Sequence, residues 1–165
     1  MCRRLVASSA MRWWKSATSD RSLVLLRVQG LLAALWGGLL LCVAFMAAPS
    51  AFAVLEKAQA GLLVGRLFAQ EAHLSLAAAL LLMMMDRRMT RDSELSAVRA
   101  ELLLPAAALF CTVLGYFALQ PLMAAARAGQ GSWSFMSLHA VSFALYGLKT
   151  LAVLALAWRC SGRAP

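Results

Sequence analysis

The sequence predicts an all-α integral membrane protein, a four-helix bundle that crosses a bilayer and has both its N-terminus and its C-terminus in the cytoplasm. Hydrophobic residues make up 62% of the 165 residues, and the mean hydropathy is +0.75. Soluble domains contain roughly 45–50% apolar residues, and a single core of this size cannot bury the excess. The apolar residues fall into four runs, each close to the roughly 20 residues that cross a hydrocarbon core of about 30 Å. These observations predict four crossings and no soluble domain.

The net charge of +9 is concentrated on one side of these runs. Six basic residues precede the first run and four lie in the connector at 86–101, whereas the connectors at 49–59 and 126–134 carry one each. They are Arg3, Arg4, Arg12, Lys15, Arg21 and Arg27, then Arg87, Arg88, Arg91 and Arg99, then Lys57 and Arg127. Because Lys and Arg accumulate in cytoplasmic segments, both termini and the middle connector are expected in the cytoplasm. This orientation explains the basic composition, so no nucleic-acid partner is predicted.

The chain begins with a basic tail at 1–22, which we expect to be irregular and to lie against the anionic inner leaflet. The first span follows at about 29–48. The sequence Ser50-Ala51-Phe52-Ala53 resembles a signal-peptidase site, so a cleaved signal peptide is the competing interpretation. The apolar run is longer than the 7–15 residues of a signal-peptide core, which favours a retained helix.

Three further spans are predicted at about 60–85, 102–125 and 135–158, so the membrane domain covers 23–158 and a cytoplasmic tail follows at 159–165. Pro105 lies in the first turn of the third span, where a missing N–H costs little. Pro121 is expected to kink or fray the same helix near its far end. The sequence shows no convincing internal repeat.

Small residues four positions apart mark helix faces that approach closely, because helices in lipid pack through close backbone contact. These faces predict a tightly packed bundle, either within one chain or against a second copy or a membrane partner. The pairs are Ala33 and Gly37, Ala34 and Gly38, Gly38 and Cys42, Gly61 and Gly65, and Cys111 and Gly115. The four cysteines, Cys2, Cys42, Cys111 and Cys160, have neither a disulfide-framework spacing nor a metal-site spacing.

The second span carries polar residues that are expensive in a bilayer, since a charge at a helix centre costs about 2.5–3.5 kcal/mol on insertion scales. At 100° per residue, Arg66, Gln70 and His73 form one stripe, whereas Glu71 points to one side of it, closer to Ser75. Arg66 is shallow enough to reach the interface instead. Glu71 is the hardest of these residues to explain without a function.

The fourth span has a matching stripe, formed by His139, Ser142, Tyr146, Lys149 and Thr150. Such a stripe should face the bundle interior or another subunit. Glu71 lies roughly 16 Å and Lys149 roughly 21 Å from the outer ends of their antiparallel helices, so an ion pair between them is allowed. The candidate buried polar site is therefore Arg66, Gln70, Glu71, His73, His139, Ser142, Tyr146 and Lys149.

Motifs of enzyme catalysis are missing from the sequence. We find no Walker A loop, GxSxG, HExxH or dinucleotide-binding motif, so neither enzymatic activity nor a metal site is predicted. His73 and His139 fit hydrogen-bonded packing residues better than metal or haem ligands.

Three segments of the chain carry a family resemblance. They are Leu35-Trp36-Gly37-Gly38 with Phe45 and Phe52, Ala60-Gly61 through Gly65-Arg66-Leu67-Phe68 to His73, and Phe135-xxx-His139-xx-Ser142. Over roughly residues 26–158 the chain resembles bacterial members of the family related to eukaryotic transmembrane protein 205, which is domain of unknown function 4149. Eukaryotic relatives often carry Pro where this chain has Ala69. The resemblance implies a four-helix protein of the bacterial inner membrane and supplies no biochemical activity.

Three functional hypotheses follow. The first is a non-enzymatic bundle whose polar stripe binds, or lets pass, a small polar solute or a proton. The second is a haem-associated redox protein with His73 or His139 as axial ligand, because the Trp-Gly first span also resembles the copper-resistance CopD and haem-binding oxidase families. Those families use a histidine in the first span, and this chain has none there. The third is an accessory subunit whose stripe pairs with a partner helix.

Overall fold

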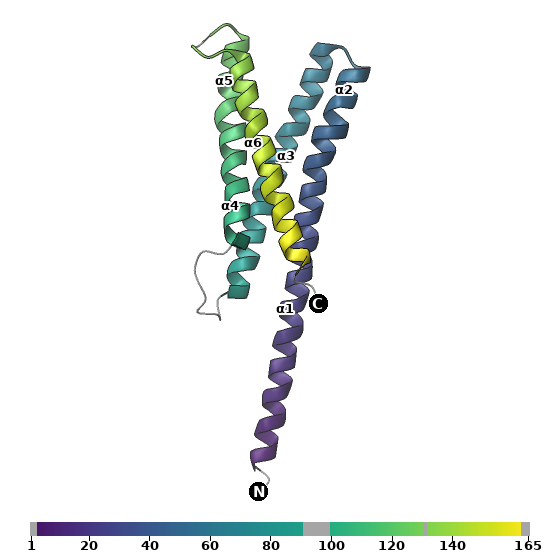
Figure 1. Ribbon diagram of the computed structural model, residues 1–165, viewed down its shortest axis with the longest axis vertical. Coiled ribbons are helices and arrows are strands. Elements are labelled where there is room, and N and C mark those ends of the chain that lie inside the picture. Colours follow the sequence, from purple (N-terminus) through teal and green to yellow (C-terminus); the bar gives the residue numbers. More distant parts are fainter. Residues whose placement is uncertain (1–2, 91–99, 131, 163–165) are drawn as a thin grey trace.

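A computed structural model describes residues 3–90, 100–130 and 132–162 as a bundle of four long helical spans (Figure 1). Within these ranges there is no strand, which confirms the all-α prediction. Four helices are long and apolar enough to cross a membrane, namely Leu23–Val54, Lys57–Met89, Ala100–Arg127 and Phe135–Ser161. Arg91, Arg99 and Arg163 lie outside the described residues.

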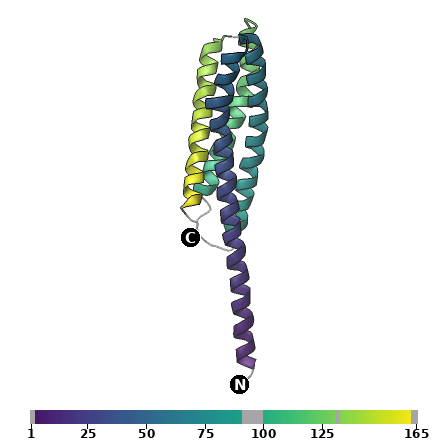
Figure 2. The same cartoon turned by 90° about the vertical axis from the view of Figure 1, so that its right-hand side faces the viewer.

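The first helix, α1, covers Arg3–Cys42, so the prediction of an irregular tail at 1–22 is wrong. The tail contains neither Gly nor Pro, and nothing in the sequence before Gly30 interrupts the ladder of backbone hydrogen bonds. Figure 2 shows that the N-terminal half of α1 extends alone beyond the other helices. This part of α1 is therefore a single helix that projects from the bundle.

Two spans contain a π-helical segment, and each segment precedes a proline. In the first span η1 (Val43–Ala47) joins α1 to α2 (Ala48–Val54), and in the third η2 (Val113–Ala118) joins α4 (Ala100–Thr112) to α5 (Leu119–Arg127). The N–H of Ala48 donates to the carbonyl of Val43, and that of Leu119 to Leu114, five residues back in each case. Pro49 and Pro121 follow closely, and a proline removes an N–H and clashes with the preceding turn. The wider turns let both helices continue past their prolines.

The other two spans are the uninterrupted helices α3 (Lys57–Thr90) and α6 (Phe135–Ser161). Around the bundle α1 contacts α3, α3 contacts α4, α4 contacts α6 and α6 contacts α1. Helices α3 and α6 therefore lie diagonally opposite each other, as do α1 and α4. The chain forms two hairpins, α1 to α3 and α4 to α6.

The bundle has two unlike ends, which we call the turn end and the terminal end. The turn end carries the connectors after Val54 and after Arg127, and the terminal end carries the C-terminal residues of α6. Toward the turn end α2 packs on α3 and α5 packs on α6, but among the described residues α2 contacts neither α5 nor α6. Figure 1 shows the two arms diverging there. The hairpins therefore meet over the terminal half and separate beyond it.

The two hairpins share one pattern of buried positions, although no convincing internal repeat is visible in the sequence. A single constant offset pairs buried residues of α1 and α4, namely Gln29 with Glu101, Ala33 with Pro105, Trp36 with Ala108, and Leu40 with Thr112. The same offset pairs Pro49 with Pro121. A second constant offset pairs buried residues of α3 and α6, namely Ala60 with Leu138, Glu71 with Lys149, Ser75 with Val153, and Leu82 with Cys160. The bundle therefore has an approximate two-fold axis along its length.

The main core fills the terminal half. Its fully buried members come from all four spans and are Ala33, Leu40, Ala79, Leu82, Ala108, Val153 and Leu156, with Trp36 and Cys160 nearly buried. A smaller cluster of Leu119, Met123 and Leu138 closes the second hairpin at the turn end. The Glu71–Lys149 ion pair described below lies between these two clusters, and a second polar layer lies at the terminal end.

Candidate functional site

A buried ion pair links α3 to α6 near the middle of both helices. The Nζ of Lys149 lies 2.8 Å from Oε1 and 2.9 Å from Oε2 of Glu71, so the ammonium donates to both carboxylate oxygens. The Lys149 side chain is 4% exposed and that of Glu71 is 3% exposed. The structure thus pairs the two residues whose depth and helix position allowed a pair.

The carboxylate of Glu71 is held by a second set of donors. Ser75, one turn further along α3, donates its hydroxyl hydrogen to Oε1 of Glu71. Trp36 of α1 donates its indole Nε1–H to the Ser75 oxygen over 2.9 Å. These hydrogen bonds form a continuous network from Trp36 of α1 through Ser75 and Glu71 of α3 to Lys149 of α6.

The ring of Tyr146 lies beside the ammonium of Lys149. The Nζ of Lys149 lies 4.6 Å from the centroid of the Tyr146 ring, within the range of a cation–π contact. The Tyr146 hydroxyl donates to the carbonyl of Leu40 over 2.8 Å, and the edge of Phe68 meets the ring at a centroid distance of 5.3 Å. Tyr146 therefore joins the two hairpins by a hydrogen bond to α1 and an aromatic contact to α3.

The pair consists of one positive and one negative charge, so its net charge is zero and each charge is stabilised by the other. Each charge in a low-dielectric interior depends on its partner, and removing one partner of a buried pair typically costs about 3–5 kcal/mol. Both carboxylate oxygens of Glu71 accept hydrogen bonds, Oε1 from Ser75 and Lys149 and Oε2 from Lys149. The arrangement holds one carboxylate and one ammonium in contact, with the Ser75 hydroxyl donating to the carboxylate.

The sequence placed eight residues at this site, and the structure brings together only part of them. Glu71, Tyr146 and Lys149 belong to the network, and Ser142 donates to the carbonyl of Gly115 over 3.3 Å within the second hairpin. The other four are exposed, so their assignment to a buried site is wrong: Arg66, Gln70, His73 and His139. On a helix of 100° per residue, Arg66 and His73 lie about 140° and 160° from Glu71 and thus on the far face of α3.

The two histidines have local partners of their own. The Nδ1 of His73 lies 2.7 Å from the carbonyl oxygen of Ala69, and its ring meets Phe117 edge to face at 5.6 Å. The ring of His139 stacks on Phe135 at 5.7 Å, and Arg127 lies over that same Phe135 ring at 4.7 Å. Among the described residues no three His, Cys, Asp or Glu side chains are grouped so that they could hold a metal ion.

Sequence reasoning missed Trp36 and Ser75 as site residues. A serine one turn from Glu71 was a usable signal, because residues four apart share a helix face. The Trp36 indole gave no such signal, since a Trp in an apolar span also fits a plain packing role.

A second polar layer lies at the terminal end. Glu101 is 1% exposed, and the Nε of Arg159 lies 3.2 Å from its Oε1. Gln29 is also 1% exposed, and both polar atoms of its amide lack a hydrogen-bond partner in the part of the chain that the structure describes. Gln29 and Glu101 occupy equivalent positions in the two hairpins. Glu101 has Arg159 as an ion-pair partner, whereas the Gln29 amide has no hydrogen-bond partner among the described residues.

The small-residue faces divide into two groups. A Cβ on Gly37 would lie 3.1 Å from Cδ2 of Leu154, and one on Gly115 would lie 3.3 Å from Cβ of Leu145, so both glycines allow close packing on α6. A Cβ on Gly38, Gly61 or Gly65 would have no described atom within 4 Å apart from its own helix backbone and chain neighbours. Close packing within the chain therefore uses only some of the predicted faces.

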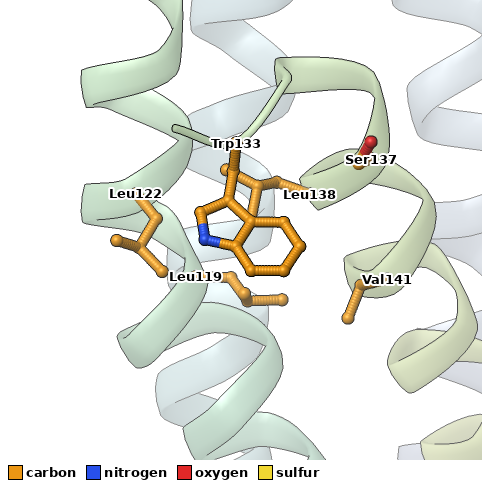
Figure 3. Close-up of a pocket in the computed structure, with 6 residues that line it drawn as sticks. All are labelled: Leu119, Leu122, Trp133, Ser137, Leu138 and Val141. Atoms are coloured by element: carbon orange, nitrogen blue, oxygen red, sulfur yellow. The ribbon is translucent and has the colours of Figure 1, made fainter. Parts of the chain in front are cut away.

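An apolar hollow of about 310 Å³ lies between α5 and α6 at the turn end. Its lining consists of Leu119, Leu122, Trp133, Ser137, Leu138 and Val141. Figure 3 shows the Trp133 indole between the leucines of α5 and Val141 of α6. No charged residue lines the hollow, and none of its lining residues belongs to the ion-pair network.

Fold and site together define a multi-pass α-helical membrane protein with a buried charge pair in its centre. The family model described as "Domain of unknown function (DUF4149)" matches residues 31–132, and the chain belongs to this family. No curated protein and no solved structure matches the chain. The matched region contains Trp36, Glu71 and Ser75, but it ends before Lys149 and before the Phe135-xxx-His139-xx-Ser142 segment.

Proposed function

We propose that this chain is a non-enzymatic protein of the bacterial inner membrane that binds a proton or a small polar solute at the Glu71–Lys149 pair. One observation carries the proposal: both charges are almost fully buried in the middle of apolar helices. A helical bundle that serves only as an anchor gains little from such a pair, because hydrophobic residues of similar volume are often equally stable or better. Ionisable groups within membrane spans commonly mark a path or site for ions and solutes.

The packing favours binding over passage. On the terminal side of the pair, Leu40, Leu82 and Leu156 are fully buried and close the bundle with apolar side chains. On the turn side the two hairpins diverge. A proton or solute would therefore reach the pair from the turn end. With both termini in the cytoplasm, as the basic segments favour, the turn end faces outward.

Infrared difference spectroscopy on protein in lipid nanodiscs tests this function. Acid titration, or addition of small polar solutes, should change the carboxylate stretching band of the wild-type protein. The change should vanish in Glu71→Gln. It should persist in Glu101→Gln, which alters a carboxyl group that is equally buried but outside the network. A wild-type protein without such a band, or a band lost only in Glu101→Gln, would contradict the proposal.

The open small-residue faces support a second candidate, an accessory subunit or homo-oligomer. Gly38 on α1 and Gly61 and Gly65 on α3 leave room for close approach of another helix. Small residues at such positions are typical of helix–helix contacts in lipid. Leucine at Gly38 or Gly61 should dissociate a complex seen by native electrophoresis, whereas a particle of unchanged size would count against this role.

A further inference from the structure

In the Glu71–Lys149 pair, the carboxylate binds an ammonium and the ammonium binds a carboxylate. Glu71 accepts two N–H···O contacts from a primary ammonium, which also lies over the face of an aromatic ring. Lys149 in turn has a carboxylate within 2.8–2.9 Å as its anion. Each side chain therefore shows which group the other would accept from outside: Glu71 a primary ammonium, and Lys149 a carboxylate.

The residues around the pair make hydrogen bonds that do not involve Lys149. Ser75 donates to the carboxylate, Trp36 donates to the Ser75 oxygen, and the Tyr146 hydroxyl donates to the Leu40 carbonyl. No described backbone contact joins α3 to α6, so the carboxylate and the ammonium meet only through their side chains. Beside the pair, the described contacts between α3 and α6 include the ring contact of Phe68 with Tyr146.

Charge balance decides what can enter between them. A single cation bound at Glu71 would leave Lys149 as an unpaired buried charge, and a single anion bound at Lys149 would leave Glu71 unpaired. Either outcome carries the penalty of an uncompensated charge in a low-dielectric interior. A molecule with both an ammonium and a carboxylate replaces both partners at once and leaves the net charge of the site unchanged.

We infer that the ligand of this site is a small zwitterion with a primary ammonium and a carboxylate, as in a short amino acid. The inference rests on the proposed function and names the class of solute. The ammonium of the ligand binds Glu71 beside the Tyr146 ring, and its carboxylate binds the Nζ of Lys149. We expect the ligand to enter from the turn end, where, among the described residues, α2 contacts neither α5 nor α6. In the free protein Lys149 and Glu71 fill each other's sites, so they act as tethered competitors of the ligand.

Equilibrium binding to wild-type protein in nanodiscs tests the ligand class. The probes are glycine, β-alanine and 4-aminobutyrate, whose two charges are increasingly far apart, with methylammonium and propionate as singly charged controls. At least one zwitterion should bind saturably, and both controls should bind about 100-fold more weakly or not at all. Equal binding of a zwitterion and a singly charged control would overturn the inference.

Two single variants sharpen the test by changing the preferred charge. Lys149→Met leaves an unpaired carboxylate, so it should lose the zwitterion and bind methylammonium. Glu71→Gln leaves an unpaired ammonium, so it should bind propionate. Since either variant could misfold, the exchange Glu71→Lys with Lys149→Glu keeps the pair and should still bind the zwitterion. Failure of all three to show these preferences would contradict the assignment.

The two proposals fail separately. An infrared band at Glu71 that responds to acid while no zwitterion binds would support the proposed function as proton uptake and overturn the zwitterion. Zwitterion binding that persists unchanged in Glu71→Gln would overturn the inference as well, because the ammonium site would then lie elsewhere.

Discussion

Glu71 and Lys149 connect α3 with α6, two helices that lie diagonally across the bundle and share no described backbone contact. The link passes through the centre of the protein and is reinforced by Tyr146, which bonds to the Leu40 carbonyl of α1. The polar layer thus joins the two hairpins at this level, beside the ring contacts of Phe68 with Tyr146 and of His73 with Phe117. The predictions below test how that layer and its surroundings contribute to stability.

The first prediction concerns the coupling within the pair. Glu71→Gln and Lys149→Met should each lower the free energy of unfolding by about 3–5 kcal/mol, because each leaves the other charge buried without a partner. Their combination should be less damaging than the sum of the two. Unfolding titrations in detergent micelles measure all three values. Strictly additive losses would mean that the two charges do not interact.

The second prediction concerns the Trp36–Ser75 contact. Trp36→Phe and Ser75→Ala each remove one partner of a buried hydrogen bond and should cost about 1–3 kcal/mol of stability. The double variant should show a coupling energy of about 0.5–3 kcal/mol. Trp158→Phe is the matched control, since Trp158 is 81% exposed and its change should be nearly neutral. A similar loss in Trp158→Phe would point to a general effect of losing an indole.

The third prediction uses two neighbouring glycines. Gly37→Leu would drive a side chain against Leu154 and Val153 of α6, so it should destabilise the bundle by about 1–3 kcal/mol. Gly38→Leu points into open space and should leave the stability of the monomer unchanged. Thermal unfolding in detergent, followed by circular dichroism, distinguishes the two. The reverse order of stabilities would contradict the packing of α1 on α6.

The fourth prediction concerns the buried amide at the terminal end. Gln29→Leu should stabilise the protein by about 1–3 kcal/mol, because it removes two polar atoms that have no partner among the described residues. Gln70→Leu is the control, since Gln70 is exposed and its replacement should change stability by less than about 0.5 kcal/mol. A loss of stability in Gln29→Leu would show that the amide is hydrogen-bonded in the membrane.

The sequence was sufficient to predict the four spans and to show that an ion pair between Glu71 and Lys149 is allowed, but it left open whether the pair forms. Run length determined the spans, and the cost of a buried charge together with helix depth singled out Glu71 and Lys149. The face of α3 was harder to predict, because a membrane helix is apolar on every side and its hydropathy does not show which side is buried. Polar residues therefore led the prediction to Arg66 and His73, whereas the buried face holds Ala72, Ser75 and Ala79. The family match covers residues 31–132, and so the extent of the resemblance was smaller than the 26–158 expected.

The sequence also did not predict that the two hairpins share one pattern of buried positions. Equivalent positions share burial but rarely residue type, as Trp36 with Ala108 and Leu40 with Thr112 illustrate. Burial depends on neighbours that are distant in sequence, so a comparison of residue letters does not detect it. The prolines after η1 and η2 are the clearest identical pair.

The approximate two-fold symmetry limits which chains can place two opposite charges at equivalent positions in the middle of the bundle. In a homodimer of identical hairpins, the position of Glu71 would face its own copy, and the membrane interior would hold two acids or two bases at close range. Like charges at that depth repel strongly and cannot neutralise each other. Joining two unlike hairpins in one polypeptide removes this restriction, because each half can change its residue independently. A carboxylate opposite an ammonium at the approximate axis therefore requires two different hairpins, and this chain supplies both in one polypeptide.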